Sequence, residues 1–175
     1  MGMPFLDGDD VHSPTNKEKM RAGIPLTDED REGWLRKIRE IGEHIVQEQR
    51  RSNAGGRTRL GVVIACSALR KAYRDILRGK TRPTVLGDRN LNSEVVSPLC
   101  TYFMFLAGDR EVLLKRMQMR DGHFMKANML ESQLATLEVP GKGEEGVVVL
   151  GLEDDMEKQV QDARDGLEEL ARMAM

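Results

Sequence analysis

Two aspartates near the start of the chain are the first residues whose spacing could do chemistry. Asp7 and Asp9 stand two residues apart, directly after a short apolar run that ends at Leu6. If an extended strand continues to Asp9, both carboxylates leave the same side of the chain. Such a pair can hold Mg²⁺ through water and can accept a proton from a substrate hydroxyl. A solvated acidic turn with Asp10 as a helix cap explains the same residues, and the spacing does not choose between the two interpretations.

A second group of candidates lies on a basic helix predicted over residues 68–78. The uncharged run at 60–66 predicts a strand covered on both faces, and Ser67 can cap the helix that follows. Ligands in an open α/β sheet bind beyond the carboxyl ends of the strands, so this helix would point its cations toward an anion. Arg74 is the preferred ligand candidate, whereas a solvated face paired with Asp75 is preferred for the two outer arginines. The four cations are Arg70, Lys71, Arg74 and Arg78.

Further cations precede a break between two predicted helices in the second half of the chain. Arg116 and Arg120 share a helix face, and His123 follows in the break. Arginines on a closing segment suit the stabilisation of charge during phosphoryl transfer, although cations are also common at helix ends because of the helix dipole. His12 can contact a substrate or can simply be a turn residue.

Composition excludes several classes of function. The net charge of −2 and the aromatic content of 4% argue against a nucleic-acid binder. The apolar runs are too short to span a bilayer and no signal-peptide pattern opens the chain, so a cytoplasmic protein without a membrane partner is expected. Cys66 and Cys100 lack metal-ligand spacing and are expected to be buried thiols. The sequence contains neither GxxxxGK[ST] nor GxGxxG, so it offers no recognisable phosphate cradle.

The hydrophobic pattern predicts the strands and helices that position these candidate residues. Apolar runs predict strands, and apolar residues at helical spacing predict helices between them. A long helix that opens at a Thr27–Asp30 capping box carries an apolar stripe of Trp34, Ile38, Ile41 and Ile45. The resulting order, β-α-α-β-α-β-α-α-β-α, is typical of a parallel sheet wrapped by helices. The strands are expected near residues 1–6, 60–66, 101–107 and 147–150.

Several blocks of sequence resemble the gluconokinase family, the small kinases that phosphorylate D-gluconate on its 6-hydroxyl with ATP. The resemblance implies a P-loop kinase fold, which is a three-layer αβα parallel sheet with strand order 2-3-1-4-5. It also implies ATP and Mg²⁺ as cofactors. The blocks are FLDGDDVH (5–12), NKEKM (16–20), the stretch from Gly23 through IPLTDEDR to Trp34-Leu35, CSALRKAYRDILR (66–78), FLAGD (105–109) and GHFMKANMLESQLATLEVP (122–140).

The same resemblance implies that one unit of the fold is missing. In such kinases the first strand, the Walker A loop and the first helix precede the FLDGD block, which here begins at residue 5. We therefore expect a single domain over 1–175 that is incomplete at its N-terminus and lacks the central strand between the strands at 61–66 and 102–107. A lid is expected at 110–140, and a mobile insertion at 79–100.

The resemblance also assigns roles to individual residues. Asp9 would orient or deprotonate the attacking hydroxyl, Asp7 would lie near Mg²⁺ on the substrate side, and the lid would close over the phosphates. A homodimer is a further expectation. The alternative is a non-catalytic remnant that binds gluconate or pairs with a subunit but has no ATP site. The remaining implied residues are His12, Asn16, Lys19, Arg74 and His123 for the substrate, Arg116 and Arg120 for catalysis, and Lys126 for the nucleotide.

Overall fold

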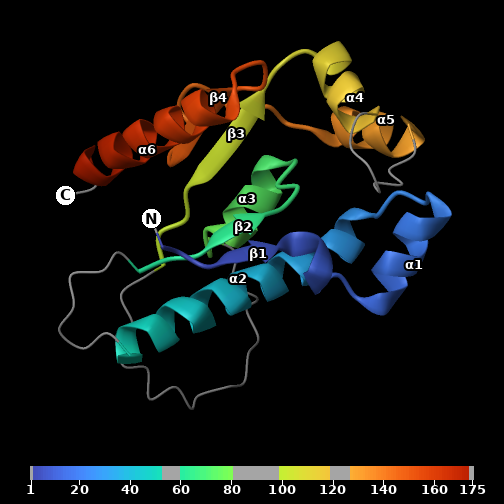
Figure 1. The fold of residues 1–175 in the computed structure, drawn as a ribbon. Helices are drawn as coiled ribbons and strands as arrows, with labels where there is room; N and C mark the ends of the chain where they lie inside the picture. Colours follow the sequence, from blue (N-terminus) through green and yellow to red (C-terminus); the bar gives the residue numbers. More distant parts are fainter. Residues whose placement is uncertain (1, 53–59, 81–98, 119–126, 174–175) are drawn as a thin grey trace. The chain divides into compact units, whose positions relative to one another are not determined.

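The computed structural model describes residues 2–52, 60–80, 99–118 and 127–173 (Figure 1). The predicted order of strands and helices is confirmed, with a short 3₁₀ helix as an addition after the first strand. The elements are β1 (Phe5–Asp7), η1 (Gly8–Val11), α1 (Pro14–Ala22), α2 (Asp28–Ser52), β2 (Val63–Ala65), α3 (Lys71–Leu77), β3 (Phe103–Ala107), α4 (Arg110–Gln118), α5 (Ala127–Thr136), β4 (Val147–Gly151) and α6 (Met156–Met173).

The chain divides into two compact units. The first comprises Met1–Cys100 with Glu131–Glu138, and the second comprises Thr101–Leu130 with Val139–Met175. In the first unit β1 and β2 run parallel, with Leu6 opposite Ile64. The long helix α2 packs beneath them through buried apolar side chains and also contacts α3. This unit holds the turn after β1 and most of the candidate residues.

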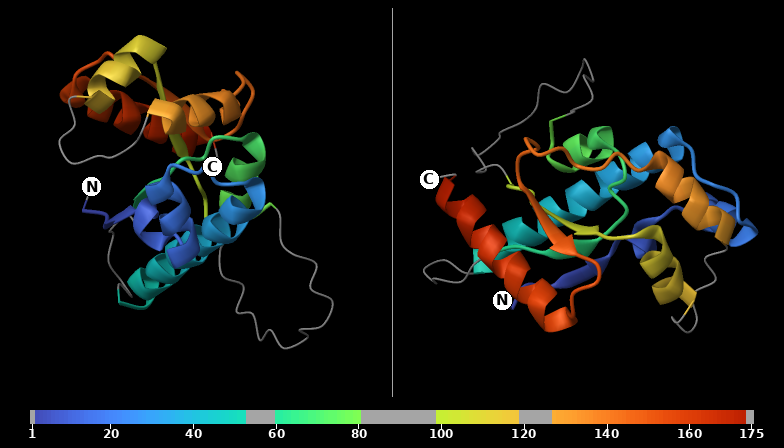
Figure 2. Two further views of the ribbon diagram at one scale, coloured as in Figure 1. Left: turned by 90° about the vertical axis from the view of Figure 1, so that its right-hand side faces the viewer. Right: turned by 90° about the horizontal axis from the view of Figure 1, so that it is seen from above.

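The second unit is a parallel pair of strands with one long helix. β3 and β4 pair along their whole length, and α6 lies along β4 (Figure 2). Gly166 allows this approach, because a Cβ atom there would lie 2.6 Å from a methyl group of Val148. The second unit therefore presents β3 and β4 with a single covering helix.

The two strand pairs agree with the implied strand order. Pairs 2-3 and 4-5 of the order 2-3-1-4-5 correspond to β1-β2 and β3-β4, which form two separate two-stranded sheets. Within the described ranges, no strand pairs with the other edge of β2 or of β3.

The prediction that the strands are covered on both faces is wrong for this structure. Val63 and Leu106 are each 50% exposed and Val149 is 61% exposed. Alternate side chains of a strand point to opposite faces, and here only one of the two is well covered.

Short-range caps begin and end α1 in the first unit, and the predicted capping box at the start of α2 is confirmed. The Ser13 hydroxyl accepts the Asn16 amide at the start of α1, and Gly23 ends that helix with φ of 77°. Thr27 and Asp30 cap α2 reciprocally, with side chain to backbone distances of 3.2 and 3.0 Å.

Other local predictions need correction. Ser67 does not cap α3, whose N-cap is Arg70 without a side-chain hydrogen bond. The buried stripe of α2 continues from Ile38 to Gly42 and Val46, whereas Ile41 and Ile45 are only half-buried. Each four-residue step turns the position by about 40° in the same direction, so the buried stripe winds gradually around the helix axis.

Two features bear on other expectations from the sequence. The thiol of Cys66 is largely covered and burial raises its pKa to about 11, whereas Cys100 is exposed and the expectation of a second buried thiol is wrong.

None of the described helices is long and apolar enough to cross a membrane. Most of the expected insertion at 79–100 lies outside the described residues.

Candidate active site

The chain turns sharply at the end of β1, and this turn holds both aspartates. The strand ends at Asp7, and Gly8–Val11 form a 3₁₀ helix, so the strand does not continue to Asp9 as one interpretation required. The Asp7 Oδ1 atom accepts the Asp9 amide at 3.0 Å and caps the turn, whereas one of the two interpretations of the sequence gave a capping role to Asp10. The Asp9 side chain is 62% exposed and available to a ligand.

Gly8 fixes the turn against its neighbours. A Cβ atom at this position would lie 2.6 Å from the Ala65 carbonyl oxygen, closer than packing allows. The Gly8 carbonyl oxygen accepts a hydrogen bond from the Trp34 indole at 2.7 Å. The turn is therefore attached both to the end of β2 and to the buried face of α2.

His12 lies behind the turn instead of projecting from it. Its ring stacks on Trp34 with centroids 4.2 Å apart, and its side chain is only 3% exposed. The Nε2 atom is 3.8 Å from Asp9 Oδ1, and among the described residues Nδ1 has no hydrogen-bond partner. Burial lowers the pKa of His12, an effect that the Asp9 carboxylate opposes. The imidazole beside the Asp9 carboxylate therefore binds a proton less readily than a free histidine does.

Asn16 and Lys19, both expected on the substrate side, contact the first turn of α2. The Asn16 side-chain amide donates to the Asp30 carbonyl at 2.9 Å. The Lys19 ammonium donates to both Asp30 carboxylate oxygens at 2.7 and 2.8 Å, which lowers the pKa of Asp30. Both side chains thus hold α1 against α2, and their substrate contacts stay a prediction.

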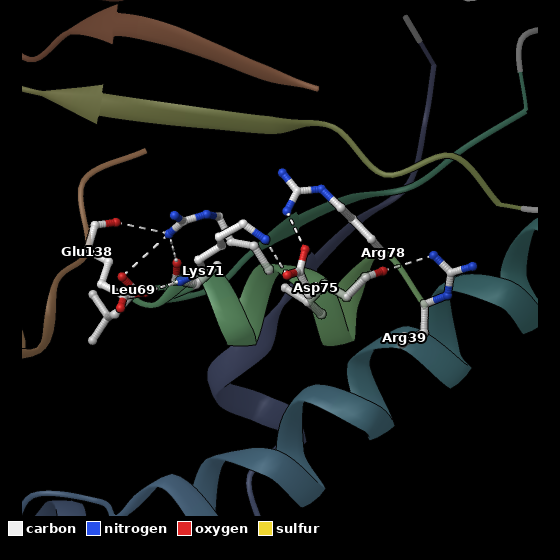
Figure 3. Close-up of polar contacts among 9 residues, drawn as sticks. Arg39, Leu69, Lys71, Asp75, Arg78 and Glu138 are labelled. Atoms are coloured by element: carbon white, nitrogen blue, oxygen red, sulfur yellow. Dashed lines mark hydrogen bonds and ion pairs between the residues drawn. The ribbon is translucent and has the colours of Figure 1, made fainter. Parts of the chain in front are cut away.

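Arg74 is buried within the protein at 3% exposure. Its Nη1 atom donates to the Ala68 and Glu138 carbonyls at 3.0 and 3.1 Å. Glu138 also donates its amide to the Leu69 carbonyl and accepts the Lys71 amide on its carboxylate (Figure 3). We call this set of contacts the Glu138 clamp. Arg74 therefore has a structural role here, and its expected contact with the substrate stays a prediction.

The other cations of the basic helix also have protein partners. Lys71 and Arg78 both bind the Asp75 carboxylate, at 2.5 and 3.1 Å, and these contacts lower the pKa of Asp75 (Figure 3). Arg70 pairs with Asp28 at 2.5 Å and not with Asp75. The expectation that α3 directs four cations at an anion is therefore not supported by the geometry.

Arg31 is a site residue that the sequence interpretation missed. It is 9% exposed on α2, and its guanidinium carbon lies 5.9 Å from the centre of the Tyr73 ring. The Tyr73 hydroxyl donates to Asp28 at 2.5 Å, and burial followed by this hydrogen bond raises the pKa of Tyr73. A signal was available, because Arg31 precedes Trp34 by three residues and so shares the apolar face of the helix.

The lid expected at 110–140 is only partly described. Arg116 is exposed near the end of α4 in the second unit. Arg120, His123 and Lys126 lie outside the described residues. In the part of the chain that the structure describes, no group of three or more His, Cys, Asp or Glu residues could hold a metal ion. The candidate site consists of the Asp7–His12 turn with Trp34, Arg31 and Tyr73.

Comparison with solved structures places this fold in a class. The chain is similar to a sugar kinase from Janibacter sp. HTCC2649, with a TM-score of 0.70 and 37% identity over 96% of this chain and 81% of that one. It is equally similar to a gluconokinase from Sinorhizobium meliloti 1021, with a TM-score of 0.70 and 38% identity over 99% and 79% of the two chains. The chain therefore has the P-loop kinase fold of small sugar kinases.

Sequence relatives narrow the class. A probable gluconokinase of Schizosaccharomyces pombe is 38% identical over 167 residues, which cover 94% of this chain and 75% of the relative. The thermosensitive gluconokinase of Escherichia coli K12 is 37% identical over 160 residues, or 91% and 71% of the two chains. No family model matches. The chain belongs to the gluconokinase family.

Proposed function

We propose that this protein transfers the terminal phosphoryl group of ATP to the 6-hydroxyl of D-gluconate. The observation that carries the proposal is the exposed Asp9 carboxylate on a rigid turn beyond β1, in a chain whose relatives are named gluconokinases. A carboxylate in this position can accept the proton of the attacking hydroxyl. The same turn is supported by the end of β2 and by α2, which suits the positioning that phosphoryl transfer requires.

Mg²⁺ fits the chemistry of the turn. One oxygen of Asp7 accepts the Asp9 amide, and the other oxygen, together with the exposed Asp9 carboxylate, offers hard oxygen ligands. Mg²⁺ in kinases commonly takes one or two carboxylates, waters and substrate phosphates. When bound, the ion would neutralise charge on the phosphates. Arg116 and Arg120 are proposed to stabilise the transferred group, with His123 on the substrate side and Lys126 on the nucleotide.

The catalytic role of Asp9 is tested by replacing it with Asn. Removal of a general base typically lowers the rate about 10²- to 10⁴-fold, so Asp9→Asn should lose at least 100-fold in kcat for gluconate phosphorylation. Asp10→Asn, one residue along the same turn, is the matched control and should keep kcat within about 3-fold. Formation of 6-phosphogluconate is measured with MgATP. Equal rates for Asp9→Asn and Asp10→Asn would rule out the proposed base.

The nucleotide half of the reaction is tested separately by titrating ATP into the chain in a calorimeter. ATP binding at micromolar concentrations supports a kinase. Gluconate binding without ATP binding instead supports a non-catalytic gluconate-binding protein. We also propose a cytoplasmic location and a homodimer.

A further inference from the structure

Arg31 is mostly buried, and among the described residues its guanidinium has no ion-pair partner. Arg31 is 9% exposed, and none of the described residues places a carboxylate within ion-pair distance of it. Burying a cation without a partner is costly, so such residues are rare unless a ligand completes them. The burial of Arg31 therefore points to an anionic ligand as its partner.

Asp28, an acid one turn before Arg31 on the same helix, already has two other partners. Asp28 accepts the Tyr73 hydroxyl on one oxygen and pairs with Arg70 on the other. Arg31 and Arg70 both lie 5.9 Å from the centre of the Tyr73 ring, but only Arg70 has a carboxylate partner. The ring face offers Arg31 a weak cation–π contact, which does not neutralise it. Within the described ranges, Arg31 thus has an aromatic ring beside it but no carboxylate partner.

The nitrogen atoms of Arg31 remain accessible to a ligand. Within the described ranges, His12 Nδ1 is the sole side-chain polar atom that is fully enclosed and unpartnered. Any guanidinium N–H group of Arg31 that lacks a protein acceptor must therefore reach the surface. A planar fork of donors at the edge of a buried ring is suited to bidentate binding of a carboxylate.

Arg31 and Asp9 are linked through His12 and Trp34. The Asp9 carboxylate is 3.8 Å from His12 Nε2, the His12 ring stacks on Trp34, and Arg31 lies about one helical turn before Trp34 on the buried face of α2. A ligand that carries a carboxylate at one end and a reactive hydroxyl at the other would extend from Arg31 to Asp9. Gluconate has this arrangement, with its carboxylate at C1 and its reactive hydroxyl at C6.

We infer that Arg31 binds the carboxylate of the sugar acid and so selects acids over neutral polyols, an inference that rests on the proposed function. The side chain holds the substrate by its C1 end while Asp9 faces the hydroxyl at C6. Arg31 is a binding residue in this role and takes no part in proton transfer.

Calorimetric titration of the 175-residue chain with gluconate tests the inference directly. Arg31→Ala should raise the Kd for gluconate about 10- to 100-fold, the usual effect of losing a charged hydrogen-bonded pair. Arg31→Lys keeps the charge but loses the fork, and should fall between wild type and Arg31→Ala. Arg36→Ala removes a partly exposed arginine of the same helix that is paired with Glu32, and should leave the Kd within 2-fold.

Two further measurements separate binding from a structural role. D-gluconamide has the same carbon chain without the charge, and its Kd should change less than 3-fold between wild type and Arg31→Ala. Arg31→Met fills a similar volume without a buried charge, so its unfolding temperature should equal or exceed that of wild type. If Arg31→Met unfolds well below wild type and binds gluconate normally, Arg31 is structural and the inference is wrong.

The outcomes for the inference and for the proposed function are distinct. Wild-type binding of gluconate that Arg31→Ala retains in full overturns the inference and leaves the proposed function intact. Arg31-dependent binding of another hexonate, without binding of gluconate, supports the inference and overturns gluconate as the substrate. A wild-type chain that binds no sugar acid overturns both.

Discussion

At the scale of single residues, His12 is the most constrained titratable group near the turn. Its ring is stacked on Trp34, its Nε2 atom faces Asp9, and burial keeps its pKa below the ordinary value of 6.5. The folded protein therefore binds a proton at His12 less readily than the unfolded chain does. Protonation of this one ring opposes folding.

The stability of the protein should consequently depend on pH through His12. The folded pKa is lowered, so its stabilising contribution is complete above about pH 6.5 and is lost as the pH falls below that value. Urea unfolding at intervals from pH 7.5 to 5.5 should show a falling free energy of unfolding. His12→Phe keeps an aromatic stack but cannot titrate, and should flatten the curve.

Other carboxylates do not obscure this window. The pKa values of Asp30 and Asp75 are also lowered, by Lys19 and Lys71 respectively, but these contributions are lost only below about pH 4. A slope between pH 7.5 and 5.5 that persists unchanged in His12→Phe would show that another group is responsible.

The contacts of a side chain could be predicted from the sequence when its partner lies only a few residues away along the chain. Ser13, Gly23 and the Thr27–Asp30 box act on backbone groups within a few residues, so their types alone identify them. Arg74 could not be placed in this way, because its carbonyl partner on Glu138 is 64 residues away. The burial of Arg31 likewise depends on the packing of α3 against α2.

At the scale of elements, α3 depends on groups from other parts of the chain. Its own N-cap residue, Arg70, provides no side-chain hydrogen bond. The Glu138 carboxylate accepts the Lys71 amide instead, and the Arg39 guanidinium binds the Leu77 carbonyl at the opposite end (Figure 3). Both ends of this seven-residue helix are thus completed by side chains distant in sequence.

Removing the Glu138 side chain, which caps α3 from a distant part of the chain, should lower the stability of the first unit. Glu138→Ala leaves the Lys71 amide without its acceptor, and loss of a helix cap typically costs about 1 kcal/mol in unfolding free energy. Glu153→Ala, at an exposed glutamate of the second unit, is the control and should change stability by less than about 0.5 kcal/mol. Equal stabilities for the two variants in urea titrations would contradict a capping role for Glu138.

The pattern of apolar residues predicted where strands and helices form better than it predicted which strand faces are covered. Short uncharged runs identified β2, β3 and β4, and helical spacing identified α2 and α6. The same runs were also expected to be covered on both faces, yet Val63, Leu106 and Val149 are well exposed. A strand's composition indicates that its faces are apolar but does not guarantee a covering layer.

At the scale of the whole molecule, the candidate site belongs to one of the two compact units. The turn after β1, the start of α2 and the start of α3 all lie in the first unit. β3, β4 and α6 belong to the second. Binding of a sugar acid at Arg31 and Asp9 should therefore stabilise the first unit more than the second.

Hydrogen exchange should reveal this difference. Gluconate at about 100 times its Kd would stabilise the structure that binds it by about 2.7 kcal/mol. Backbone amides of β1 and α2 should slow by up to about 100-fold, whereas those of β4 and α6 should change less than 3-fold. Mass spectrometry of peptides with and without gluconate measures both sets. Comparable slowing in β4 and α6 would mean that the site involves the second unit as well.

The position of Cys66 behind the turn has a practical consequence for chemical labelling. Alkylating reagents attack the thiolate, and with a pKa of about 11 very little of this thiol is ionised at neutral pH. Cys100 is exposed and should take up a maleimide dye first, without any need to remove the other cysteine. Later uptake by Cys66 would then record how often the structure around Gly8 opens.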